Sequence, residues 1–231
     1  MPSQLKATLV DSMGTDLTVV NAARVSFNKE STFDISEMGV FLKASDQKLL
    51  DFLSKNDHFT PYTHCMITMR EKVPLFVARQ RFKHTVGFSY NEISRRYVEE
   101  IPEFYIPDEW RAKHRDRKQG SSKETIDINP RNLMIDEYLQ SINKAKWTYI
   151  HLLGIDVCPE QARMVLPQST FTEYYVTGSL YAWARAYKLR SEETAQREIQ
   201  DLAKQWHDII ITLFPQSWLS LVDNLKGGSD E

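Results

Sequence analysis

The chain has 231 residues, with 29 lysines and arginines against 31 aspartates and glutamates, so its formal net charge is −2. This balance argues against a protein that binds nucleic acid over its whole surface, because such binding needs a broad basic face. A hydrophobic share of 42% is enough for a buried core, and we expect one domain spanning residues 1–231.

The first residues contain no apolar core of a signal peptide, and no apolar run in the sequence is long enough to span a bilayer. The sequence contains two cysteines, Cys65 and Cys158. We therefore expect a cytoplasmic protein without a membrane partner.

The N-terminal part of the chain predicts alternating strands and helices. We expect a strand at 7–13, a helix at 16–27 capped by Asp16, irregular chain at 28–44, a helix at 45–53 capped by Ser45, and a strand at 64–70. In the second strand Cys65, Ile67 and Met69 alternate, so they should share one face of a sheet.

Residues 79–97 place cationic and hydrogen-bonding side chains between aromatic ones, around a single glycine. This mixture favours a pocket for a phosphorylated, planar ligand, because arginine binds phosphate through a bidentate fork and aromatic rings stack on heterocycles. We expect a helix from Pro74, a tight turn at Gly87, and a second helix in which Ser89 and Glu92 form a capping box. On that interpretation the two residues have only a structural role, as a helix cap and as a surface ion pair of Glu92 with Arg96. For the whole cluster we favour a binding site, because arginines this dense beside Tyr90 and Tyr97 exceed what solubility requires. In the first helix, the i,i+4 spacing should place Gln80 beside His84 and Arg79 beside Lys83.

The second half of the chain is expected to be mostly helical. After a short strand at 104–106, the charged run at 111–123 predicts a solvated surface loop without chemistry. Helices are expected at 133–153, from Pro159 to the break at Pro167, and at 178–189, 192–214 and 218–225, with a flexible tail at 226–231. The fold class is therefore α+β, with a small antiparallel sheet.

Common cofactor and metal signatures are absent from the sequence. There is no glycine-rich dinucleotide fingerprint and no Walker loop, so a bound nucleotide would be held by side chains and helix ends. The six histidines form no His-Glu-x-x-His pattern, and two distant cysteines cannot form a thiolate zinc cage. We expect no metal site.

Several separated motifs occur between about residue 10 and about residue 215: 21–27, 58–61, 76–80, 89–97, 162–167 and 189–190. In order and spacing they resemble flavin-dependent thymidylate synthase, the ThyX family. The resemblance implies a ThyX-like fold and a homotetramer whose active sites lie between subunits. It also implies a methyltransferase that converts dUMP to dTMP with methylenetetrahydrofolate as carbon donor, FAD as relay and NADPH as reductant.

The resemblance also implies roles for individual side chains. The residues that would bind dUMP are Gln80, Arg81, Lys83, Glu92, Ser94, Arg95, Arg96 and Arg163. The residues that would border FAD are Thr60, Lys83, His84, Thr85, Glu92, Ser179, Tyr181 and Arg185, with Ser26 and His58 nearby.

Arg190 would be the catalytic residue, by the same resemblance. It would favour ionisation at N3 of uracil, so that C5 becomes nucleophilic. A guanidinium suits this task because it stays charged and hydrogen-bonds planar oxyanions in a water-poor site. The alternative from the residues alone is a helix-end arginine paired with Glu192 or Glu193 in solvent.

Two departures from the family pattern concern the flavin. The family has Arg-His-Arg, seven residues and then Ser, whereas here Lys-His-Thr at 83–85 is followed by eight residues before Ser94. Lysine loses the fork and Thr85 loses a charge, which predicts a weaker or rearranged grip on the flavin. Tyr181 and Arg185 stand where the family pattern has Arg and Asn.

Three alternatives stay open. Cys158, just before Pro159, could be a thiolate nucleophile at a helix N-terminus, but it matches no required cysteine of the family, so we expect a structural thiol. The altered residues 83–85 motivate a flavin-dependent methylase or hydroxymethylase of another pyrimidine nucleotide. A non-catalytic nucleotide or RNA-binding module would use Tyr90 and Tyr97 as a stacking platform, and it predicts no bound flavin.

Overall fold

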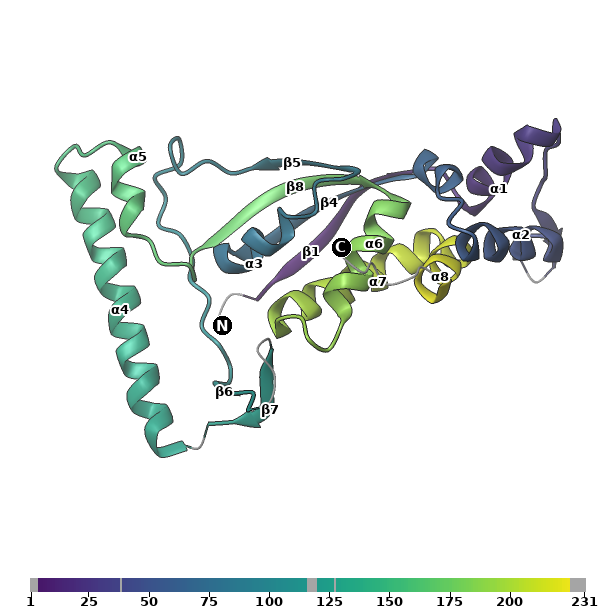
Figure 1. The fold of residues 1–231 in the computed structure, drawn as a ribbon. Helices are drawn as coiled ribbons and strands as arrows, with labels where there is room; N and C mark the ends of the chain where they lie inside the picture. Colours follow the sequence, from purple (N-terminus) through teal and green to yellow (C-terminus); the bar gives the residue numbers. More distant parts are fainter. Residues whose placement is uncertain (1–3, 38, 116–119, 127, 225–231) are drawn as a thin grey trace.

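A four-stranded antiparallel sheet with strand order β1-β4-β8-β5 lies at the centre of the computed structural model (Figure 1). The structure describes residues 4–37, 39–115, 120–126 and 128–224. The strands of the central sheet are β1 (Lys6–Met13), β4 (Met66–Pro74), β5 (Phe88–Glu92) and β8 (Phe171–Ser179). The long β4–β8 pairing joins the two halves of the chain into one sheet.

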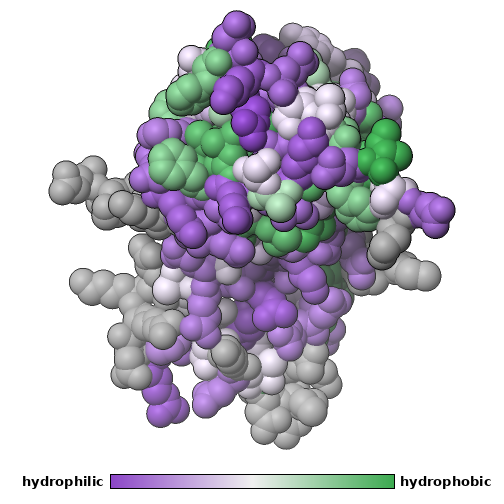
Figure 2. All heavy atoms as spheres, turned by 90° about the vertical axis from the view of Figure 1, so that its right-hand side faces the viewer, coloured by the Kyte–Doolittle hydropathy of each residue, from purple (hydrophilic) through white to green (hydrophobic). Residues whose placement is uncertain are grey.

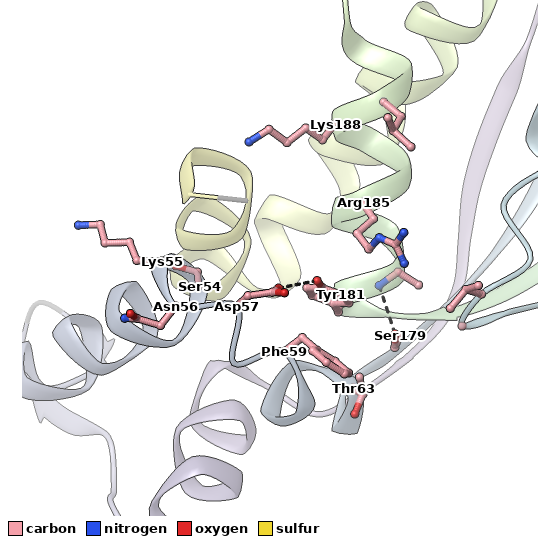
Figure 3. Close-up of a pocket in the computed structure, with 14 residues that line it drawn as sticks. Ser54, Lys55, Asn56, Asp57, Phe59, Thr63, Ser179, Tyr181, Arg185 and Lys188 are labelled. Atoms are coloured by element: carbon pink, nitrogen blue, oxygen red, sulfur yellow. Dashed lines mark hydrogen bonds between the residues drawn. The ribbon is translucent and has the colours of Figure 1, made fainter. Parts of the chain in front are cut away.

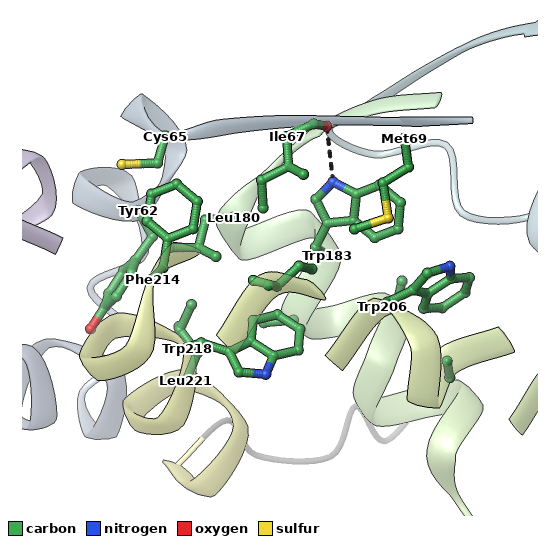
Figure 4. Close-up of a cluster of buried hydrophobic side chains, with 14 of the residues drawn as sticks. Tyr62, Cys65, Ile67, Met69, Leu180, Trp183, Trp206, Phe214, Trp218 and Leu221 are labelled. Atoms are coloured by element: carbon green, nitrogen blue, oxygen red, sulfur yellow. Dashed lines mark hydrogen bonds between the residues drawn. The ribbon is translucent and has the colours of Figure 1, made fainter. Parts of the chain in front are cut away.

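One face of β4 is buried because apolar and polar residues alternate along it. Ile67 and Met69 are fully buried, and so is Cys65 just before the strand, whereas Arg70 is exposed. The expected sharing of one face by Cys65, Ile67 and Met69 is therefore confirmed. The indole N–H of Trp183, in helix α6 (Leu180–Ser191), donates to the carbonyl oxygen of Ile67 at 3.2 Å and fixes that helix against the sheet (Figure 4).

Helices cover this face of the sheet and form the core with it. They are α6 (Leu180–Ser191), α7 (Arg197–Leu213) and α8 (Pro215–Asn224). Trp183, Trp206 and Trp218 are fully buried between them (Figure 4). Burying a large apolar side chain contributes roughly 1.5–3 kcal/mol, so these helices are held chiefly by this cluster.

The remaining elements extend the molecule at its two ends (Figure 1). At one end lie α1 (Asp16–Arg24), η1 (Val25–Phe27), β2 (Asp34–Ser36), β3 (Gly39–Phe41), α2 (Ala44–Lys55) and η2 (Thr60–His64). Towards the other end lie β6 (Arg111–Lys113), β7 (Ser121–Thr125), α4 (Ile128–Gly154), α5 (Pro159–Ala162) and η3 (Arg163–Val165). The short helix α3 (Leu75–Arg81) follows β4 directly. None of the helices in the described part of the chain is long and apolar enough to cross a membrane.

Residues 88–92 form the edge strand β5 rather than the second helix expected there, so Ser89 and Glu92 make no capping box. Phe88 and Tyr90 alternate and turn towards the core, where their rings pack. Glu92 instead accepts a hydrogen bond from the hydroxyl of Thr172 on β8 at 2.6 Å. Pairing with a distant strand, which local spacing does not reveal, decides this conformation.

The strand β8 occupies a stretch where no strand was expected, and α6 begins only at Leu180. Glycine is required at position 178 of this strand, because a Cβ there would lie 2.3 Å from the ring of Phe88. Ser179 becomes the N-cap of α6, and its hydroxyl accepts from the backbone N–H of Ala182 at 3.2 Å.

Helix starts also differ from expectation. Thr15, not Asp16, occupies the N-cap of α1, and Lys43, not Ser45, occupies that of α2. The carboxylate of Asp16 accepts from the backbone N–H groups of Gln216 and Ser217 at 3.0 and 2.9 Å, so it caps α8 instead.

The other differences concern segments that local patterns describe poorly. The α3 helix ends at Arg81, so the i,i+4 pairs expected to reach 83–84 are not formed within a helix. The stretch 28–44 contains the β2–β3 hairpin, and 111–123 contains β6 and part of β7, with 116–119 outside the described residues. The expected short strand at 104–106 is an isolated bridge of Phe104.

In the C-terminal half, the helix expected from 192 begins at Arg197. The segment between Pro159 and Pro167 forms only a short α-helix and a 3-10 turn. The tail at 226–231 lies outside the described residues.

Candidate active site

A cavity of about 760 Å³ lies between α6, the end of α2 and the loop before β5 (Figure 3). One face of α6 supplies Tyr181, Arg185 and Lys188, which are spaced i, i+4 and i+7. The opposite face of the same helix is buried in the core through Trp183 and Ala184. The amphipathic helix therefore places a ring and two cations along one wall of the cavity.

An aromatic pair lies at one end of this wall. The rings of Phe59 and Tyr181 are stacked, with centroids 5.1 Å apart and planes inclined by 29°. The Tyr181 hydroxyl donates to Asp57 Oδ1 at 2.8 Å. Burial, and then this hydrogen bond, raise the pKa of Tyr181 to about 12, so the ring stays neutral.

The backbone at Gly87 lets the loop before β5 approach α6. Its φ of +77° favours glycine, and a Cβ there would lie 2.9 Å from Cβ of Ala182. The cavity wall at this point is therefore backbone.

The residues around this cavity fit a flavin dinucleotide. Stacked rings suit a planar heterocycle, and Arg185 and Lys188 suit a diphosphate. Ser179, Tyr181 and Arg185, expected to border FAD, all line the cavity. Thr60 and His58 flank Phe59 in sequence, but the threonine of η2 that lines the cavity is Thr63. Lining residues that were not predicted include Lys55, Phe59 and Lys188; helical spacing from Tyr181 and Arg185 would have revealed Lys188.

Arg190 lines a second cavity, of about 470 Å³, together with Gln80 from α3 and Gln196 from the α6–α7 loop. Its Nε donates to Nε2 of His84 at 2.8 Å, and its Nη2 donates to the carbonyl oxygen of Gln80 at 3.2 Å. Burial, and then the charge of Arg81, lower the pKa of Arg190. Arg190 is thus turned inward onto α3 and the turn that follows it, rather than being a solvent-exposed helix-end residue.

His84 holds Arg190 as a neutral imidazole. Burial, and then the charges of Arg190, Arg81 and Arg185, lower the pKa of His84 to about 3. A neutral ring can accept at Nε2 only with its proton on Nδ1, so the contact with Arg190 also fixes the tautomer.

A chain of hydrogen bonds surrounds the second cavity. Gln80 donates to Gln196 at 2.6 Å, Gln196 donates to Glu198 at 2.9 Å, and Arg111 donates to Glu198 at 2.7 Å. These contacts join α3, the α6–α7 connection and β6. Of these residues, Gln80 alone was expected at the site, because the others follow no recognisable local pattern.

Arg81, which was expected to bind dUMP, is fully buried in the protein core. Its guanidinium pairs with Glu71 at 3.4 Å and donates to the Tyr90 hydroxyl at 2.5 Å. It also lies over the rings of Phe88 and Trp183, at 4.3 and 4.7 Å from their centroids. Arg81 lines neither cavity.

The remaining residues expected at the dUMP site are not brought to these cavities by a single chain. Arg96 donates to Ser94 Oγ at 3.2 Å and Arg95 donates to the carbonyl oxygen of Glu100 at 2.5 Å, in the loop after β5. Arg163 is exposed in η3, near α4. Lys83 and Thr85 are exposed on either side of His84, and Ser26 is exposed in η1.

No group of three or more His, Cys, Asp or Glu side chains within the described residues could hold a metal ion. The donors at both cavities are cations, amides and hydroxyls, which suit anionic and hydrogen-bonding ligands.

Comparison with known proteins decides the family. The family model described as "Thymidylate synthase complementing protein" matches residues 8–216. A flavin-dependent thymidylate synthase from Thermosipho africanus is 36% identical over 226 residues, covering 95% of this chain and 94% of the relative. One from Thermotoga neapolitana is 37% identical over 195 residues, covering 84% and 80%.

The chain belongs to the flavin-dependent thymidylate synthase family. It is therefore a methyltransferase of a flavin-dependent family. The crystal structure of PolB from Streptomyces cacaoi, a UMP/dUMP methylase bound with 5-Br dUMP, has a TM-score of 0.83 at 28% identity and covers 96% of each chain. The same enzyme bound with 5-Br UMP gives a TM-score of 0.81 at 27% identity, covering 96% of this chain and 95% of PolB. The ThyX resemblance and the α+β fold class inferred from the sequence are both confirmed.

Proposed function

We propose that this family member methylates dUMP to dTMP, with methylenetetrahydrofolate as carbon donor, FAD as relay and NADPH as reductant. The observation that carries the proposal is the placement of Arg190, which lies in a cavity wall and is held by His84 and by the Gln80 carbonyl. A guanidinium has five N–H donors, and these two contacts leave the others for a ligand.

Arg190 stabilises negative charge on the uracil ring. By hydrogen-bonding the ring as its N3 proton is lost, it favours the ionised form and makes C5 more nucleophilic. Gln80 supplies an amide on the same cavity wall. When bound, FAD would supply the relay of carbon and hydride.

Some of the proposed ligand contacts line the two cavities, namely Ser179, Tyr181 and Arg185 the first and Gln80 the second, and the others are proposed from the family resemblance. Ser179, Tyr181 and Arg185 hold FAD, with Thr60, Lys83, His84, Thr85 and Glu92 as further contacts and Ser26 and His58 nearby. The nucleotide is held by Gln80, Lys83, Glu92, Ser94, Arg95, Arg96 and Arg163. The core position of Arg81 gives it an indirect role, as a support for Tyr90 and β5.

We propose that the enzyme is a homotetramer of a single-domain chain, with active sites between subunits. Two observations support this. Arg163 and the 94–96 segment do not line the cavity of Arg190, and in the proposed tetramer a second chain would supply them. Large apolar side chains are exposed at both ends of the chain, including Ile35 at 82% and Phe27 at 77% near α1, and Trp147 at 58% on α4 (Figure 2 for the α1 and α2 end).

We place the enzyme in the cytoplasm, where small-molecule substrates are its partners. Cys65 and Cys158 are both free, as is usual in a reducing compartment. We propose that Cys158 is a structural thiol and takes no part in the reaction, so Cys158→Ala should leave turnover intact.

A second candidate is methylation of UMP. It is favoured by the likeness to PolB, which was solved with both bromonucleotides. The two candidates share the same use of Arg190 and differ only at the sugar.

Anaerobic incubation with FAD, NADPH, methylenetetrahydrofolate and either dUMP or UMP tests both candidates, with mass spectrometry of the nucleotide product. Formation of dTMP supports the first proposal, and a methylated ribonucleotide supports the second. Unchanged nucleotides in both reactions, although the flavin is bound and reduced, would refute both.

A further inference from the structure

The cavity beside α6 is lined by more positively charged than negatively charged side chains. Lys55 at the end of α2 and Arg185 and Lys188 on α6 line it, and Asp57 is the acidic residue among its lining. The carboxylate of Asp57 is engaged with the Tyr181 hydroxyl. None of the three cations forms an ion pair with another residue in the described ranges. The cavity therefore favours an anionic ligand.

The cations are set apart from the aromatic surface along the helix axis. Tyr181 and Lys188 are separated by seven residues, a rise of roughly 10 Å along an α-helix. The stacked Phe59 and Tyr181 rings lie at the start of α6, and Lys188 lies two turns further on, with Lys55 on the α2 side of the cavity (Figure 3). This arrangement suits a ligand with a planar ring at one end and phosphate groups further along.

On the basis of the proposed function, we propose that Lys55 and Lys188 bind the diphosphate of FAD, while Phe59 and Tyr181 stack on one of its rings. Lys55 comes from the end of α2 and Lys188 from α6, so the two lysines belong to different segments of the cavity lining. Lysine is a compact point charge and suits a diphosphate without demanding the geometry of an arginine fork.

The test is a calorimetric titration of flavins into the purified apo-protein at low salt. FAD carries the diphosphate, and riboflavin keeps the ring system without it. The variants are Lys55→Gln, Lys188→Gln and the double substitution. Lys48→Gln is the matched control, because Lys48 is an exposed lysine of the same helix as Lys55 and lies outside the cavity lining.

We expect each single substitution to weaken FAD binding about fivefold and the double substitution about twentyfold, the scale of exposed charge contacts. Riboflavin binding and the Lys48→Gln variant should change less than twofold. Raising the salt concentration should weaken FAD binding to the unmodified protein and leave riboflavin binding nearly constant, which checks the idea without any substitution. Phe59→Leu should weaken both flavins.

Other outcomes overturn the assignment. Equal losses of affinity for FAD and riboflavin, or an unchanged FAD affinity in the double variant, would refute the proposed contact of the lysines with the diphosphate. The proposal that the protein is a flavin enzyme would still stand. A loss seen only for NADPH, titrated in a third arm, would assign the lysines to the reductant instead. Unmodified protein that binds neither flavin would refute the proposed function, and the lysine assignment with it.

Discussion

Arg81 and Arg190 both contact the region where α3 ends, yet the chain treats their charges in opposite ways. Arg81 is fully buried and pairs with Glu71, and aromatic rings surround its guanidinium. Arg190 is only partly buried, and it bonds a neutral imidazole and a carbonyl oxygen. It has no carboxylate partner among the residues that the structure describes.

The difference separates a structural cation from a functional one. The charge of a guanidinium that is paired with a carboxylate is already neutralised and does not attract a ligand. Removing the carboxylate leaves an unpaired buried charge, which destabilises the fold. A guanidinium held by neutral acceptors keeps its charge and its orientation, so it can act on an anion that arrives later.

The largest expected effect is on the structural side. Glu71→Gln removes the carboxylate and leaves Arg81 buried without a counter-charge, which should cost about 3–5 kcal/mol of stability. Thermal or urea unfolding at a fixed protein concentration measures it. Tyr174, whose hydroxyl donates to Glu71 Oε2 at 2.6 Å, loses a charged acceptor in the same variant.

The double substitution Glu71→Leu with Arg81→Met is the control for this prediction. It removes both charges together and should recover most of the lost stability, since an apolar pair of similar volume replaces a buried ion pair at little cost. If Glu71→Gln alone were as stable as the unmodified protein, Arg81 would not be the structural cation described above.

Of the two arginines, only Arg190 was assigned a place from the sequence that agrees with its position at a cavity. The resemblance to the ThyX family singled out Arg190 and Gln80, whose roles stay predictions, and alternation predicted the buried face of β4. The burial of Arg81 could not be inferred, since it depends on Glu71 from β4, Tyr90 from β5 and Trp183 from α6 meeting at one point. Long-range strand pairing brings those elements together, and no local spacing encodes it.

The same limit explains the helix predicted in place of β5. Ser89 and Glu92 have capping-box spacing, and local propensity is weak beside the gain from pairing with β8 and burying Phe88. Gly178 is the residue that permits this packing, and its meaning is visible only once Phe88 is known to face it.

The next effect is on the functional side. Arg190→Gln should lower turnover of dUMP by about 10²–10³-fold, the usual cost of removing one preorganised donor to developing negative charge. The fold should be retained, because no carboxylate is left unpaired. Single-turnover product formation at saturating flavin measures it, and Arg197→Gln is the control, since Arg197 is an exposed arginine of α7. Turnover within threefold of the unmodified enzyme would remove Arg190 from the chemistry.

A smaller effect is expected where His84 holds Arg190. His84→Leu removes the acceptor at 2.8 Å, and the resulting freedom of the guanidinium should lower kcat by about 10²-fold while changing KM for dUMP little. His84→Gln keeps an acceptor oxygen and should recover at least tenfold of the loss. Equal activity in the two variants would mean that the hydrogen bond to Arg190 has no positioning role.

The smallest effect is a pH dependence that belongs to the same contact. The folded chain keeps His84 neutral because burial, and then the charges of Arg190, Arg81 and Arg185, lower its pKa to about 3 from the ordinary value of 6.5. In the unfolded chain the ring gains a proton as the pH falls below about 6.5, so the unfolded state binds more protons than the folded state. The free energy of unfolding therefore decreases as the pH falls from about 6.5 to about 3. Shifting from pH 7.5 to pH 5 should therefore lower the melting temperature of the unmodified protein more than that of His84→Gln, with exposed His58→Gln behaving like the unmodified protein. Identical pH slopes in all three proteins would show that His84 is protonated on the native state, and Arg190 would then face a like charge instead of an acceptor.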